Sequence, residues 1–187
     1  MSAKKPDLGK LADFIFETGD LKFIKRSGWW HARVSDPESV AEHSFRTALI
    51  AYLLARLARH PLPERISFLA LIHDLPESRL LDLHKISAGY VENKGEIEKR
   101  ILQEQQALAG FDFPTPSPTD AILVKDADLL EMAFTAKEYM EAGHENARIL
   151  FNEAKRKVRL PASKRFLAIL ENKRSTDWLA AINRSSK

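Results

Sequence analysis

One segment of the sequence, from about residue 119 to residue 141, is apolar on nearly every side when its residues are spaced as in a helix. Such a helix has to be central, because other elements must cover each of its faces. Elsewhere apolar residues recur every three or four positions, as between 38 and 59, and alternating runs of Val, Ile and Thr are missing. The sequence therefore predicts an all-α fold, a compact bundle of helices.

Turn-forming residues mark the helix boundaries. The prolines between 114 and 118 form a stiff connector before the central helix, which Ser117 or Thr119 caps. Residues 20–37 are expected to be a loop, and residues 78–93 a loop with short helical turns. A chain of 187 residues without repeats or linkers suits a single domain, 1–187. The helices are expected at about 8–17, 38–59, 64–75, 94–109, 119–141, 144–157 and 162–182.

The composition excludes several classes of protein. There is no cysteine, so disulfides, zinc ribbons, iron–sulfur clusters and cysteine nucleophiles are ruled out. The formal net charge is only +3, which argues weakly for a nucleic-acid partner, and none is expected. No segment approaches the ~18 consecutive apolar residues that span a membrane, and the first residues carry no apolar signal-peptide core. We expect a cytoplasmic protein without a membrane partner.

Polar residues interrupt the apolar faces of the predicted helices. His43 lies four residues before Thr47, on or beside the buried stripe of its helix. His73 and Asp74 follow the apolar run 68–72, and an aspartate at a helix C-terminus opposes the helix dipole. A nearby cation would favour the charge of Asp74. The alternatives are a core histidine bonded to a backbone carbonyl and a solvated aspartate.

The central helix carries Asp126 and Asp128 among apolar residues. A buried ionised carboxylate is very costly unless it is paired or bound to a metal. Only one of the two aspartates readily faces a given site, and helical spacing does not choose between them. The alternative to a metal site is a buried salt bridge with Lys125 or an arginine. Two imidazoles and two carboxylates suit a borderline-hard divalent ion. Such an ion polarises a phosphoryl oxygen and makes hydroxide available near neutral pH.

The order of these residues along the chain resembles the HD-domain superfamily of metal-dependent phosphohydrolases. Segments 25–29 and 37–44 look like those of its 5′-deoxynucleotidases, as do Glu77 after the His-Asp pair and Lys125 three residues before an aspartate. The resemblance covers about residues 8–145 and implies a single helical HD domain, with further helices over about 144–182. It implies four metal ligands: His43, His73, Asp74 and Asp128.

What the resemblance implies about activity is specific. The chain should be a phosphomonoesterase that hydrolyses (deoxy)nucleoside 5′-monophosphates to nucleoside and phosphate. It should hold one divalent ion per subunit, and histidine ligands favour Mn, Co, Fe or Zn over Mg. A homodimer is also implied. Because the family's aspartate follows the lysine by three positions, Asp128 would be the ligand and Asp126 a solvated or helix-pairing carboxylate.

The resemblance also assigns catalytic and substrate-binding side chains. Asp74 and Glu77 are the implied catalytic residues, and a carboxylate at Glu77 could protonate a leaving alkoxide or orient water. A surface glutamate after Pro76 is the alternative. Leu81 stands where the family has a glycine, so a different local backbone is possible at the next residue. The implied substrate contacts are Arg26 with the phosphate, Trp29 with the base or sugar, and Asp82 with the sugar.

Other residues are weaker candidates. Trp30 could take the place of Trp29, and His84 has no assigned role. Further candidate phosphate contacts are Arg33, Arg46 and Lys125.

Two other functions fit the same residues. One is an HD hydrolase acting on nucleoside triphosphates or signalling nucleotides, and the other is a metal-stabilised binding module that contacts RNA through basic ends without turnover.

Overall fold

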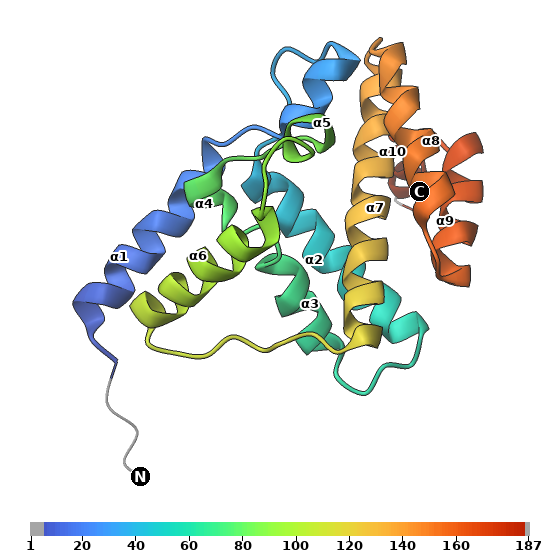
Figure 1. Ribbon diagram of the computed structural model, residues 1–187. Coiled ribbons are helices and arrows are strands. Elements are labelled where there is room, and N and C mark those ends of the chain that lie inside the picture. Colours follow the sequence, from blue (N-terminus) through green and yellow to red (C-terminus); the bar gives the residue numbers. More distant parts are fainter. Residues whose placement is uncertain (1–5, 186–187) are drawn as a thin grey trace.

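The computed structural model describes residues 6–185, and over this range it is a bundle of helices without a β-strand (Figure 1). The predicted all-α fold is confirmed. The helices are α1 (Leu8–Gly19), α2 (Val40–Leu57), α3 (Pro63–Leu71), α4 (Glu77–Leu80), α5 (Lys85–Ala88), α6 (Lys94–Ala109), α7 (Pro118–Glu141), α8 (Arg148–Lys157), α9 (Pro161–Asn172) and α10 (Asp177–Ser185). Short 3-10 helices are η1 (Asp20–Lys22), η2 (Ser27–Ala32) and η3 (Glu145–Ala147).

Helix α7 lies in the middle of the molecule, with α2 and α3 on one side and α8 and α9 on the other (Figure 1). Its start is fixed by a capping box, in which Ser117 and Asp120 bond each other's backbone N–H groups. Small side chains such as Ala127, Ala133 and Ala136 are fully buried along it and let the neighbouring helices approach. The predicted central helix is therefore confirmed, and residues on its two sides face different environments.

Helix α2 contributes the other long wall of the core. Ser39 caps it in a second capping box with Glu42. The predicted buried stripe holds from Val40 to Leu54, but Ala58 is exposed because the helix has already ended at Leu57. A smaller apolar cluster of Leu21, Val40 and Leu75 joins α2 to the side of the molecule where α1 packs on α6.

Several segments differ from the sequence prediction. Helix α3 ends at Leu71 rather than near residue 75, because Pro76 disfavours helical backbone before it, so residues 72–76 form turns. The expected loop 20–37 contains η1 and η2. The expected helix 162–182 is two helices: Lys173 is extended and ends α9, and α10 begins at Asp177, whose carboxylate accepts a hydrogen bond from Arg174 N at 2.9 Å.

Among the described residues, no helix combines the length and apolarity needed to cross a bilayer.

Candidate metal centre

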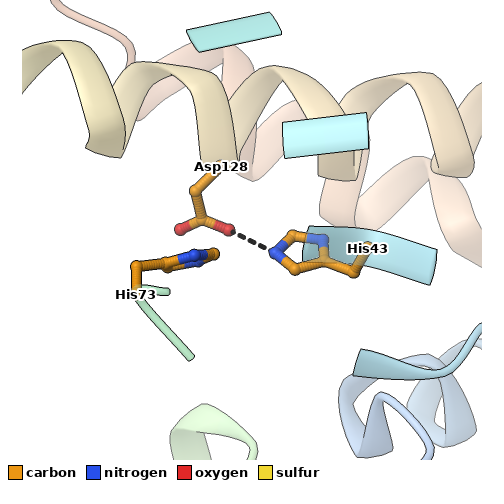
Figure 2. Close-up of side chains that lie close together, drawn as sticks. All are labelled: His43, His73 and Asp128. Carbon is orange, nitrogen blue, oxygen red and sulfur yellow. Dashed lines mark ion pairs between the residues drawn. The ribbon is translucent and has the colours of Figure 1, made fainter. Parts of the chain in front are cut away.

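Three elements bring the predicted metal-binding side chains together. His43 comes from α2, His73 from the turn after α3 and Asp128 from α7, and Figure 2 shows them directed toward one another. Their ligand atoms lie within 4.8 Å of one another, with 3.3 Å between His43 Nε2 and Asp128 Oδ1. Asp74 Oδ2 completes the group, 3.6 Å from His43 Nε2 and 3.2 Å from His73 Nε2. All four predicted ligands therefore converge.

The hydrogen bonds of the two imidazoles suit metal binding. His43 Nδ1 lies 2.6 Å from Glu131 Oε2, and His73 Nδ1 lies 2.6 Å from the carbonyl oxygen of Ala70. Both partners are acceptors, so each Nδ1 carries a hydrogen, and Nε2 is the nitrogen that each ring can offer to a metal ion. Both Nε2 atoms face the carboxylates. Two imidazole nitrogens and two carboxylates are a donor set that fits a divalent transition-metal ion.

The electrostatics of the cluster also favour a cation. Burial works against ionisation of Asp128, but the hydrogen bond with His43 and the charge of Lys125 hold its pKa well below the usual range. Burial and Arg26 lower the pKa of His43, but bonds to Asp128 and Glu131 outweigh them and raise it to about 10. The carboxylates that favour a proton on His43 Nε2 would equally favour a divalent cation beside it.

Behind His43 lies a buried ionic network that the sequence analysis missed. Glu131 is fully buried, and its Oε1 accepts hydrogen bonds from Arg46 Nη2 at 2.8 Å and from Thr135 Oγ1 at 2.8 Å. Burial raises the pKa of Glu131, but His43 and Arg46 outweigh it and bring the pKa down to about 2. Arg46, considered for a phosphate contact, is therefore bonded to this glutamate. Like Asp128, Glu131 interrupts apolar sequence in α7, and that was the available signal.

The prediction of a solvated or helix-pairing role for Asp126 is wrong. The residue is 1% exposed, and its carboxylate accepts hydrogen bonds from Arg159 N at 3.0 Å and from Leu160 N at 2.8 Å. Leu160 is the N-cap residue of α9, so Asp126 satisfies backbone groups where α9 begins. It faces the α8–α9 side of α7 and lies outside the metal cluster.

A cleft of about 360 Å³ adjoins the cluster, and Arg26 is one of the residues that line it. Its Nη1 lies 3.3 Å from Asp74 Oδ2, and its Nη2 lies 3.8 Å from Asp128 Oδ1. Burial lowers the pKa of Arg26, but these carboxylates outweigh burial and raise it, so the guanidinium stays charged. The cleft also collects other residues predicted for the site: Trp29, Glu77, Asp82, His84 and Lys125. Trp30 and Arg33 do not line it.

Glu77 is buried rather than a surface residue. It is 7% exposed, and its Oε2 has no hydrogen-bond partner among the described residues. Burial and the charges of Asp74 and Asp82 raise the pKa of Glu77 to about 9. A protonated carboxyl group in the cleft can act as a general acid.

The remaining predicted substrate contacts form the cleft wall. Trp29 is 2% exposed, and its indole N–H donates to Glu38 Oε1 at 3.0 Å, so it is a fixed wall of the cleft. The carboxylate of Asp82 accepts a hydrogen bond from Ser27 N. Leu81 has φ 66° and ψ 166°, a backbone conformation that favours glycine. The leucine therefore occupies strained backbone directly before Asp82.

Comparison with known proteins gives a consistent result. A family model described as HD domain matches residues 18–169. The 5′-deoxynucleotidase HDDC2 of Homo sapiens is 29% identical over 91% of this chain and 89% of its own. A conserved hypothetical protein from Pyrococcus furiosus superposes with a TM-score of 0.69 and 31% identity, covering 87% of this chain and 99% of that one. The HD phosphohydrolase DatZ of cyanophage S-2L, solved with dA and one catalytic Zn²⁺ ion, shares the fold with a TM-score of 0.56. It is 18% identical, and the match covers 84% of this chain and 96% of that one.

Proposed function

This chain belongs to the HD-domain family of metal-dependent phosphohydrolases, and we propose that it hydrolyses 2′-deoxynucleoside 5′-monophosphates to deoxynucleosides and phosphate. The observation that carries the proposal is the convergence of two imidazoles and two carboxylates beside a cleft that holds Arg26 and the buried Glu77. The name of the human relative, a 5′-deoxynucleotidase, supports the substrate class.

The metal centre would be built from His43, His73, Asp74 and Asp128. A divalent ion bound there supplies Lewis acidity toward the phosphoryl oxygens and lowers the pKa of a water molecule. The Glu131 carboxylate holds the Nδ1 hydrogen of His43, so that Nε2 remains the ligating atom.

The cleft residues bind and protonate the substrate. Arg26 donates hydrogen bonds to the phosphate oxygens, since its guanidinium already lies at the edge of the cluster. Water adds its oxygen to phosphorus, the bond from phosphorus to the 5′ oxygen breaks, and Glu77 gives its proton to that oxygen. The attacking water loses one proton, which restores the proton of Glu77, and its other proton stays on the product as hydrogen phosphate. Asp74 serves as a ligand and also holds Arg26, which is the catalytic role we propose for it.

The sugar would lie against Trp29 and Asp82. Trp29 is a rigid apolar surface, and Asp82 is fixed by Ser27 through its carboxylate and through its carbonyl oxygen, which accepts from Ser27 Oγ at 2.8 Å. We propose that this wall fits deoxyribose and disfavours the additional hydroxyl of ribose.

Three finer properties complete the proposal. The metal is Mn, Co, Fe or Zn rather than Mg, because two of its ligands are imidazoles. The location is cytoplasmic. The assembly is a homodimer, for which α2 offers an apolar stripe at helical spacing, each residue at least half exposed: Phe45, Leu49, Leu53 and Leu57.

Phosphate release tests the activity. The protein is stripped of metal and then supplied with Mn, Co, Mg or Zn and a panel of deoxy- and ribonucleoside mono- and triphosphates. We expect orthophosphate from deoxynucleoside monophosphates. Release of pyrophosphate or triphosphate would instead identify a nucleoside triphosphate hydrolase, and no release with any metal would exclude the enzyme. Salt-dependent RNA binding without turnover would indicate a binding module.

A further inference from the structure

A second recess, of about 270 Å³, opens from the outer end of the cleft. The two hollows share part of their lining: Gly28, His84, Lys85, Leu150 and Glu153. The far walls of the recess come from η2, α5 and α8 and are largely apolar, with Ala32, Ile86 and Ile149 among them. The cleft beside the metal cluster and the apolar recess therefore adjoin each other along these shared residues, and the two together are called the channel.

The polarity of this channel changes along its length. At the inner end lie Arg26 and the metal-cluster carboxylates, and at the seam Lys85 and Glu153 pair with each other at 3.3 Å. At the outer end Ile86 and Ile149 are 59% and 66% exposed, on opposite elements. A nucleoside monophosphate has the same order of groups: a charged phosphate, a hydroxylated sugar and a flat base of low charge.

We propose that the recess lined by Ile86 and Ile149 is the nucleobase subsite of this enzyme. The proposal rests on the proposed function, because the phosphate and sugar positions fix where the base lies. Side chains that expose apolar surface on both sides of a recess would bury it against the two faces of a planar base.

Gly28 leaves open space where the two hollows adjoin. Its φ is not in the left-handed region, and an added Cβ would meet no atom within 4 Å. Neither the backbone nor packing therefore requires glycine at this position. A side chain there would take space from the passage, since Gly28 lines both hollows.

Polar groups at the recess can contact the edge of the base. Asn146 lines it from η3, and its carboxamide makes no hydrogen bond within residues 6–185. A carboxamide both donates and accepts, so it complements the mixed donor and acceptor edges of nucleobases. The imidazoles of His31 and His84 meet edge to face at 4.5 Å and form an adjoining wall.

The decisive comparison uses two substrates with the same sugar phosphate, one with a base and one with a hydroxyl group in its place. We would measure kcat/KM for deoxyadenosine 5′-monophosphate and for 2-deoxyribose 5-phosphate, in the wild type and in Ile86→Ala/Ile149→Ala. The double variant should lower the preference for the nucleotide about 10-fold, as lost apolar contacts in a pocket do. Both isoleucines are exposed, so the variant should fold. Ile15→Ala is the matched control, since Ile15 is 60% exposed on α1, away from the recess.

Two further variants sharpen the test. Gly28→Val should raise KM for the nucleotide more than for the sugar phosphate, because it narrows the passage. Asn146→Ala should change the relative kcat/KM among the four deoxynucleotides. An unchanged substrate preference in Ile86→Ala/Ile149→Ala would overturn the proposal.

A binding measurement separates this proposal from the activity. Isoleucine methyl groups are labelled with ¹³C, and the zinc-loaded protein is titrated with deoxyadenosine. Shifts at Ile86 and Ile149 but not at Ile15 would support the subsite even if no phosphate were released from any substrate. Saturable shifts confined to other isoleucines would place the base elsewhere and contradict the proposal.

Discussion

The two sides of α7 present nearly the same sequence feature to different surroundings. Asp126 and Asp128 are carboxylates two residues apart on one helix. Asp126 faces α8 and α9 and is satisfied by two backbone N–H groups. Asp128 faces α2 and the turn after α3, where another carboxylate and two imidazoles crowd around it. The comparison shows that the partners of a buried carboxylate decide whether it supports the fold or a function.

The physical difference lies in what remains unsatisfied. Around Asp126, donors and acceptors match, so the arrangement is complete within the protein. Around Asp128, the carboxylates of Asp74 and Asp128 lie near the Nε2 atoms of His43 and His73, and a metal cation is the natural complement of this donor set. Stability and metal affinity should therefore separate when the two sides of the helix are altered.

The largest effect is expected on the metal side. Asp128→Ala removes a direct metal ligand and should abolish turnover. Loss of a residue that only hydrogen-bonds a ligand costs up to roughly 100-fold in metal affinity, so loss of Asp128 should cost more than this. Metal content after dialysis and phosphate release measure the two effects. Added metal should restore the stripped wild type but not the variant. A variant that keeps stoichiometric metal would contradict the assignment of Asp128 as a ligand.

The next largest effect is expected at Glu131, which bonds His43, and it tests whether this buried glutamate contributes to metal affinity. Glu131→Gln keeps the shape but removes the charge that holds the Nδ1 hydrogen, so metal affinity should fall about 10–100-fold. Competition with a fluorescent zinc chelator measures it. Glu138→Gln is the control, because the Glu138 carboxylate bonds Arg46 Nη1 at 2.7 Å and no other side chain among residues 6–185. Equal affinities in the two variants would reduce Glu131 to a packing role.

On the opposite side of α7 the expected result is reversed. Asp126→Ala leaves the N–H groups of Arg159 and Leu160 without an acceptor and should cost about 1–3 kcal/mol of unfolding free energy. Urea denaturation measures the loss, while chelator competition should return the wild-type metal affinity. Asp126→Asn retains an acceptor oxygen and should lose less. A fall in metal affinity with Asp126→Ala would show that the two sides of the helix are coupled.

Local sequence signals predicted most of the fold. Helices α6 and α7 begin and end within a residue or two of their expected positions, because glycine, proline and capping residues act locally. The break between α9 and α10 was missed, since apolar spacing continues across it while the backbone becomes extended at Lys173. The turn that carries His73 was assigned to α3 for a similar reason: the apolar run continues beyond the last helical residue.

The candidate site was predictable where order along the chain carries the information. His43, His73, Asp74 and Asp128 were selected together, and the structure brings them together. The partners of Asp126 and Glu131 could not be predicted, because they depend on which elements pack across α7. Backbone N–H groups 33 and 34 residues away satisfy Asp126, and a histidine 88 residues away binds Glu131.

The smallest effect concerns strain beside the cleft. Leu81 is 59% exposed and has a backbone conformation that costs a non-glycine residue about 1–3 kcal/mol. Leu81→Gly should therefore raise the unfolding free energy, reduced by the roughly 0.5–1 kcal/mol that glycine's added freedom costs. Leu80→Gly, one residue earlier in α4, should lower it, because that backbone is helical. The preference for deoxy- over ribonucleotides is measured in the same variant. If Leu81→Gly leaves this preference unchanged, the strained backbone at Leu81 does not position Asp82. If the preference is lost, the strain at Leu81 positions Asp82 for substrate binding and does so at the expense of stability.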